Sequence, residues 1–251
     1  MNLENAIKEF EKYTNKYLNY GDMIKLKINH TFRVVDLCEK IARSNGLNEE
    51  EIIIAKLIGL LHDIGRFEQW KNYNTFRDLE SIDHGDFGVD ILNKNNYLRK
   101  YIKDDRYDQI ILDSIKYHNK YKLPNNLDKR TKIFSSIIRD ADKLDILYLY
   151  VIKEIYIDLD DSSFTNSTFD KLVMHEPINR KDIKTNTDRL SVSLGFTYDL
   201  YYKESLKYLK EKDYLNKIID IYKEKTNNKK LKEQLEIIRE ELKKYIEVKI
   251  C

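Results

Sequence analysis

Residues that interrupt regular structure are scarce in this sequence, whose 251 residues include seven glycines and two prolines. An all-β sandwich or barrel needs a turn every ~8–12 residues, and collagen-like or Pro-rich chains need many more of both residues. Long apolar runs are missing too, since Lys56 separates Ile52–Ala55 from Leu57–Leu61 and neither approaches the ~20 residues of a membrane span. The sequence therefore predicts a soluble, all-α protein with no membrane partner.

The sequence also has few cysteines and a small net charge. Because Cys38 and Cys251 lie far apart in the sequence, we expect no structural disulfide. The expected lack of a disulfide and the lack of a signal-peptide core near the N-terminus together predict a cytoplasmic protein. Forty-five basic residues balance forty-three acidic ones, and no clustered basic face indicates a nucleic-acid partner.

Apolar residues recur at helical spacing along most of the chain. They predict helices at 3–18, 22–45, from Asn48 to the His62-Asp63 pair, 83–95, 107–119 and 128–157, with two or three more near the C-terminus.

Two stretches lack this periodicity. Residues 65–82 predict a loop, and the polar stretch 158–190 predicts a mobile excursion or lid. We expect one domain over residues 1–251. The apolar stripe of the last helix, Leu231 to Ile246, favours core packing, with a homodimer contact as the alternative.

Four of the five histidines fall at the inward phase of a predicted helix or at a helix end: His30, His62, His84 and His118. Aspartates recur beside this set, and buried carboxylates are costly unless they are paired or bind a metal. A single inward histidine is usually a hydrogen-bonded core residue. The repetition instead favours a site for Fe, Mn, Co, Ni, Zn or Mg.

The order of these residues resembles the HD-domain metal-dependent phosphohydrolase superfamily, in its binuclear branch with the pattern H…HD…H…H…D. The resemblance is carried by His30, His62-Asp63-Ile64-Gly65-Arg66, His84-Gly85, His118 and Asp140-Ala-Asp-Lys-Leu144. It covers about residues 20–160 and implies an all-α bundle with the metal site between helices. Residues 161–251 would add the lid-like segment and C-terminal helices.

By position, the resemblance implies a set of ligands for two divalent cations. His30, His62, Asp63 and Asp142 would bind one ion, and Asp63 would bridge to a second ion bound by His84 and His118. Asp142 is preferred because it directly precedes Lys-Leu, and Asp140 is the alternative.

The implied activity is hydrolysis of a phosphomonoester or nucleotide by a metal-activated hydroxide. The catalytic candidates are Asp63, Arg66 and Asp145. Arg66 would bind a phosphate oxygen or, alternatively, form a surface ion pair with Glu68 or Glu80. Asp145 would orient a ligand or accept a proton, or else form a salt bridge on its own helix.

Other readings stay open. Phe67, Trp70, Tyr73 and Phe76 would stack on a nucleobase or cover an edge of the core. The superfamily also includes phosphodiesterases and nucleases, non-catalytic binding modules and di-iron oxygenases. No Gly-Tyr-Pro follows His118, which argues against hydrolysis of cyclic dinucleotides.

Overall fold

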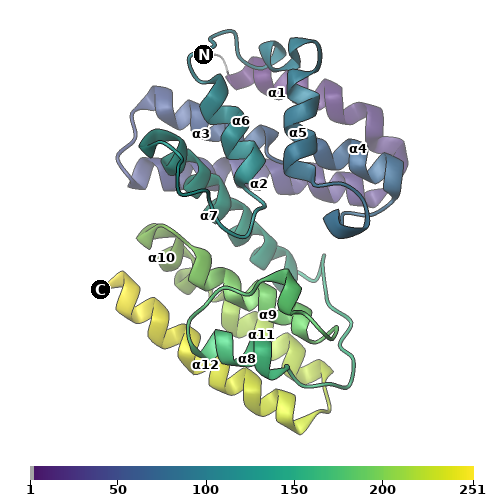
Figure 1. Cartoon of the computed structure of the whole chain (residues 1–251), viewed down its shortest axis with the longest axis vertical. Helices are drawn as coiled ribbons and strands as arrows, with labels where there is room; N and C mark the ends of the chain where they lie inside the picture. Colours follow the sequence, from purple (N-terminus) through teal and green to yellow (C-terminus); the bar gives the residue numbers. More distant parts are fainter. Residues whose placement is uncertain (1–2) are drawn as a thin grey trace. The chain divides into compact units, whose positions relative to one another are not determined.

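The computed structural model describes residues 3–251, and in that range the regular structure is helical with no strand. The expected all-α fold is therefore confirmed (Figure 1). The chain divides into two compact units, Met1–Ala141 and Asp142–Cys251. A single domain over residues 1–251 stays a prediction. None of the described helices combines the length and the apolar character needed to cross a membrane.

The first unit contains most of the predicted helices at close to their predicted bounds. These are α1 (Leu3–Thr14), α2 (Asp22–Ser44), α3 (Glu49–Leu61), α5 (His84–Asn93) and α6 (Asp108–Tyr117). The unit also contains α4 (Ile64–Tyr73) and the 3-10 turns η1 (Asn15–Tyr20), η2 (Asp78–Glu80) and η3 (Lys94–Lys100). The boundary between the units falls within α7 (Lys129–Val151), which ends before the predicted residue 157.

Helix α3 is the central helix of the first unit. Asn48 accepts a hydrogen bond from the Glu51 amide while the Glu51 carboxylate accepts one from the Asn48 amide, so the helix begins with a capping box. Most of its residues from Ile52 to Leu61 are buried, and α2 packs along it. The expectation of a buried central helix ending at His62 is confirmed.

The prediction of a loop over residues 65–82 is wrong for its first half, which forms α4. Ile64 and Phe67 are fully buried on the inner face of this helix. Polar residues share that face, because the Arg66 guanidinium donates to the buried Gln69 side chain at 2.8 Å. Because these polar residues occupy buried positions, the sequence of this helix lacks a clear apolar periodicity. Phe67 packs edge-on against Phe10, so this aromatic residue belongs to the core.

Gly65 allows α4 and α5 to approach closely. A Cβ atom there would lie 2.5 Å from the His84 carbonyl oxygen and 2.9 Å from the Gly88 amide nitrogen. Both atoms belong to the backbone and cannot rotate away. The absence of a side chain at Gly65 thus sets the distance between the Asp63 end of α4 and the His84 end of α5.

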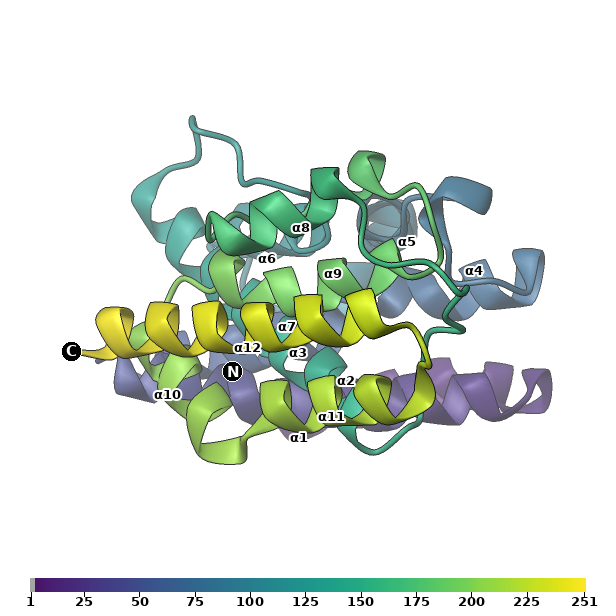
Figure 2. The same ribbon diagram turned by 90° about the horizontal axis from the view of Figure 1, so that it is seen from below.

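The second unit consists of the long helix α12 (Lys229–Ile250) and shorter helices, most of which pack on it. They are α8 (Asn166–Val173), α9 (Asp188–Gly195), α10 (Lys203–Lys212) and α11 (Tyr214–Lys225), with 3-10 turns η4 (Arg180–Asp182) and η5 (Phe196–Asp199). Figure 2 shows α12 lying beside α11. The residues of the predicted stripe are buried within this unit, which confirms core packing: Leu231, Leu235, Ile238, Leu242 and Ile246.

The predicted excursion at 158–190 is not irregular throughout, because it contains α8, η4 and the start of α9. The fully buried Asp188 holds these parts together, accepting hydrogen bonds from Thr168 at 2.7 Å and from the Thr165 amide at 2.9 Å.

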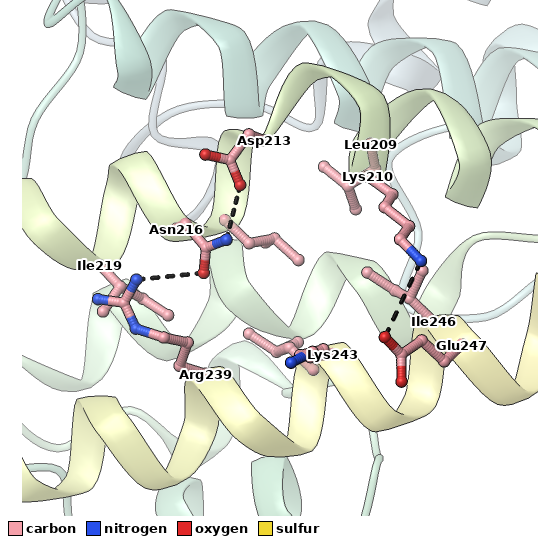
Figure 3. A pocket seen from close by; sticks show the side chains of 11 residues that line it. Leu209, Lys210, Asp213, Asn216, Ile219, Arg239, Lys243, Ile246 and Glu247 are labelled. Atoms are coloured by element: carbon pink, nitrogen blue, oxygen red, sulfur yellow. Dashed lines mark hydrogen bonds and ion pairs between the residues drawn. The ribbon is translucent and has the colours of Figure 1, made fainter.

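Elsewhere in the unit, a pocket of about 260 Å³ lies between α10, α11 and α12, with Lys210, Arg239 and Lys243 at its edge (Figure 3).

Candidate metal centre

Helix ends bring a cluster of histidines around one aspartate in the first unit. His30 lies within α2, whereas His62 ends α3 and Asp63 precedes α4. His84 begins α5 and His118 ends α6. All five side chains are buried. The sequence predicted this set, and the structure brings its members together in two overlapping groups that share Asp63.

The first group faces the Oδ2 atom of Asp63. The Nε2 atoms of His30 and His62 each lie 3.5 Å from Oδ2. These two nitrogens are 3.3 Å from one another.

The second group faces the other carboxylate oxygen. The Nε2 atoms of His84 and His118 lie 3.5 Å and 3.8 Å from Asp63 Oδ1, and 3.0 Å from each other. Each oxygen of one carboxylate therefore meets its own pair of imidazoles. Ligand atoms about 2.1 Å from one ion lie about 3.0–3.4 Å apart in octahedral or tetrahedral geometry. The two nitrogen–nitrogen distances fall in this range, and the nitrogen–oxygen distances exceed it by 0.1–0.4 Å, so small movements would let each group hold a divalent cation.

The histidine tautomers support the same conclusion. The Nδ1 atoms of His62 and His118 each lie 2.7 Å from a backbone carbonyl oxygen, which can only accept a hydrogen bond. His84 Nδ1 lies 2.7 Å from a carboxylate oxygen of Asp78. With Nδ1 protonated, each neutral imidazole directs the lone pair of Nε2 into the cluster. Two lone pairs that face each other at 3.0 Å repel, and a cation held by both nitrogens removes this repulsion.

Electrostatics favour the protonation states that a metal requires. Burial lowers the pKa of His84 to about 3, with the Arg66 charge adding to the effect, so this imidazole is neutral at physiological pH. Burial alone would raise the pKa of Asp63, but the charges of Lys27 and Arg66 help to hold it well below its usual value. His84 is therefore a neutral imidazole beside an ionised carboxylate, as divalent metal binding demands.

Sequence reasoning missed Lys27, the closest cation to the centre. Its Nζ lies 2.7 Å from Asp63 Oδ2 and 5.5 Å from the ring centre of Phe76. Lys27 precedes His30 by three residues on α2, and this helical spacing could have identified it.

Arg66 is buried and belongs to the centre, so the alternative of a surface pair with Glu68 or Glu80 is wrong. Its Nη1 donates to the Asp78 carboxylate at 2.8 Å, and its Nε lies 3.5 Å from Asp63 Oδ1. Its guanidinium also lies 5.6 Å from the ring centre of Phe76. The Nη2 group donates no hydrogen bond to any described residue.

Arg139 fixes the end of α6 that carries His118, and sequence reasoning did not single it out. Its guanidinium is buried and donates to the carbonyl oxygens of Tyr117 and His118 at 3.1 Å and 3.2 Å. Further bonds reach the carbonyls of Lys120 and Tyr121. A fixed cation at a helix C-terminus satisfies its free carbonyls and opposes the negative end of the dipole.

The predicted acidic residues of α7 have different surroundings. Asp140 is fully buried at the end of the first unit, whereas the half-buried Asp142 begins the second. Asp145 is buried in the second unit. Metal binding by Asp142 and a catalytic role for Asp145 stay predictions.

Comparison with known proteins identifies the kind of domain that carries this cluster. Residues 28–147 match the family model described as HD domain. The chain is 22% identical over 250 residues to a deoxyguanosinetriphosphate triphosphohydrolase-like protein of Clostridium tetani, covering 96% of this chain and 61% of the relative. A protein of the same description from Azoarcus is 36% identical over 61 residues, covering 24% of this chain and 15% of that one. No solved structure gives a significant match.

Proposed function

Because residues 28–147 of this chain match the HD domain model and contain the histidine cluster, we propose that the protein is a metal-dependent phosphohydrolase with a binuclear centre. The observation that carries the proposal is the position of Asp63, each of whose carboxylate oxygens faces a separate pair of histidines. When bound, two divalent cations would supply Lewis acidity, which acidifies water and neutralises charge on phosphoryl oxygens.

Each residue of the centre has a part in this proposal. His30 and His62 would hold one ion through Nε2, with Asp142 as the further ligand, and His84 and His118 would hold the other. Asp63 would be shared by the two ions. The carbonyl partners of His62 and His118 keep their Nε2 atoms unprotonated. Asp145 orients a ligand or accepts a proton.

Two cations of the chain itself would meet a phosphate at this site. The Nη2 group of Arg66 forms no hydrogen bond with the described residues, while Nη1 is anchored to Asp78. Planar guanidinium groups bind phosphate oxygens in a defined orientation. The Lys27 ammonium adds a second positive charge beside Asp63.

We propose a phosphorylated small molecule or a nucleotide as the substrate. Phe76 lies against both Lys27 and Arg66, and its ring packs against Trp70 at a tilt of 40°, with centroids 4.7 Å apart. An aromatic surface next to phosphate-binding cations suits a nucleobase. The names of the two relatives favour a deoxynucleoside triphosphate, cleaved to the nucleoside and triphosphate. A cytoplasmic location belongs to the same proposal, since both cysteines are free.

The test is to purify the protein and to measure product release from a panel of phosphomonoesters and nucleotides. Mn²⁺, Co²⁺, Ni²⁺ and Mg²⁺ are added separately, and ³¹P NMR identifies phosphate, pyrophosphate or triphosphate. We expect turnover of at least one compound, abolished by a chelator and restored by excess metal. Asp63→Ala should abolish turnover.

Glu39→Gln serves as the matched control, because it alters an ion pair with Lys56 between α2 and α3 without touching the histidine cluster. This variant should retain activity. If the metal-loaded protein turned over no member of the panel, the chain would instead be a non-catalytic binding module or an oxygenase.

A further inference from the structure

Asp78 lies directly behind the candidate metal centre, in the turn η2. Its Oδ2 atom lies 2.7 Å from His84 Nδ1, and its side chain is 10% exposed. Asn119 also donates to Oδ2, at 3.2 Å. The Oδ1 atom accepts from Arg66 at 2.8 Å and from Gln69 at 3.1 Å. Four donors thus converge on one carboxylate, and all four lie outside the turn η2 that contains Asp78.

The four donors define the ionisation state and orientation of Asp78. A protonated carboxyl group would place a hydrogen against at least one donor, so the ionised form alone satisfies all four. Gln69 Nε2 also lies within hydrogen-bond distance of the Ser81 hydroxyl and the Ile82 carbonyl, which fixes the loop that follows η2. The carboxylate is therefore held in place independently of any metal.

His84 differs from His62 and His118 in having an ionised partner. Those two donate Nδ1–H to neutral carbonyls, whereas His84 donates to a carboxylate. A carboxylate partner fixes the tautomer more firmly and raises the basicity of the metal-facing nitrogen. Asp78 is thus placed to strengthen only the histidine pair that faces Asp63 Oδ1.

We propose that Asp78 is a positioning residue that sets the affinity of the second metal ion, the one assigned to His84, His118 and Asp63 Oδ1. It acts through His84 and does not itself ligate metal. Through Oδ1 it also holds Arg66, so one carboxylate supports both the second ion and the guanidinium assigned to phosphate. The inference rests on the proposed binuclear centre.

The test is calorimetric titration of metal-free full-length protein with Mn²⁺ or Co²⁺. In the wild type we expect two binding events per chain. Asp78→Asn keeps the shape of the side chain but turns one acceptor oxygen into an NH₂ group that faces donors. We expect the affinity of one event to fall by a factor of about 10–100 while the other is unchanged. Equal weakening of both events, or of neither, would overturn the proposal.

Glu80→Gln is the matched control, because Glu80 is the other acid of η2 and pairs with Arg77 at the exposed surface. It should leave both events unchanged. A single event in the wild type would refute the binuclear centre itself, and the inference with it. Two wild-type events that Asp78→Asn leaves intact would refute the role of Asp78 alone.

A second measurement does not depend on the folding of a variant. Long-range ¹H–¹⁵N correlation spectra of the metal-free wild type report the tautomer of each histidine. We expect His84 in the Nδ1–H form with a strongly deshielded, exchange-protected proton. The Nε2–H form for His84 would contradict the proposal.

Discussion

Arg66 lies between two carboxylates, Asp63 and Asp78, and its Nη2 group donates no hydrogen bond to the described residues. Replacing it with alanine should remove a phosphate contact while Asp78 keeps Gln69 and Asn119 as donors. We expect kcat/KM of Arg66→Ala to fall by a factor of about 10–100, or about 1.4–2.7 kcal/mol of transition-state stabilisation.

Steady-state kinetics and elemental analysis of the same preparations check this prediction. The metal content should match that of the wild type. Loss of an ion with no separate effect on substrate binding would make Arg66 a residue of the metal-site scaffold instead.

The sequence predicts the residues of the cluster that repeat with helical phase. His30, His62, Asp63, His84 and His118 fall at inward positions or helix ends, and the structure collects all five. Asp78 carries no such pattern, because it lies in a turn whose path depends on Gln69 and the neighbouring backbone. Contacts of this kind depend on tertiary structure and cannot be predicted from spacing.

At the scale of elements, the crossing of α4 and α5 determines where His84 lies relative to Asp63. Gly65→Ala would place a Cβ against two backbone atoms of α5, and we expect about 1–3 kcal/mol of destabilisation with weaker metal binding. Gly88→Ala is the control at the same crossing, where a Cβ would meet ordinary contacts at 3.4 Å.

Urea unfolding and metal titration of both variants distinguish the two positions. Gly88→Ala should remain within about 1 kcal/mol of the wild type, because alanine also favours the helix. If the two variants were equally stable, α4 and α5 could separate without a cost in the free energy of unfolding. That result would contradict a close contact at Gly65.

The segment between α8 and α9 depends on Asp188, which also gives it a pH dependence. Burial alone would raise the pKa of Asp188, but hydrogen bonds from Thr168 and Thr165 lower it below its ordinary value. A lowered folded-state pKa stabilises the protein above the unfolded-state pKa of about 3.9, and this contribution is lost as pH falls through the folded-state pKa.

Asp188→Asn should therefore cost about 1–3 kcal/mol near neutral pH, since it disrupts a buried charged acceptor. The difference from the wild type should shrink as pH falls below about 4. Denaturant unfolding at several pH values measures it, with the exposed Asp170→Asn on α8 as control. A deficit that did not change with pH would contradict the assigned role of the charge.

The elements that the sequence predicts incorrectly share one physical cause. Helix α4 and the stretch 158–190 bury polar side chains, such as Gln69 and Asp188, whose hydrogen-bond partners lie elsewhere in the chain. A hydrophobic pattern cannot identify such residues as interior. The buried α3 and the stripe of α12 have apolar interior faces, and the sequence predicts both.

At the scale of the whole molecule, metal binding should stabilise the folded chain. The cluster assembles residues from α2, α3, α5 and α6 that are far apart in the unfolded state. A cation present at 100 times its Kd adds about 2.7 kcal/mol for each site. For a chain of this size that raises the Tm by about 5–10 °C.

Differential scanning calorimetry with and without Mn²⁺ or Co²⁺ measures this shift, and a chelator should reverse it. His84→Ala combined with His118→Ala should retain part of the shift, because the first histidine pair remains. A Tm that no divalent cation raises would contradict the proposal that the cluster binds metal.

The most direct test of the binuclear centre is the number of ions that the protein holds at saturation. Metal-free protein is loaded with Mn²⁺ or Co²⁺, separated from free metal and analysed for metal and protein content. Because each oxygen of Asp63 faces its own histidine pair, the wild type should hold two ions per chain. Saturation at one ion per chain would contradict the account.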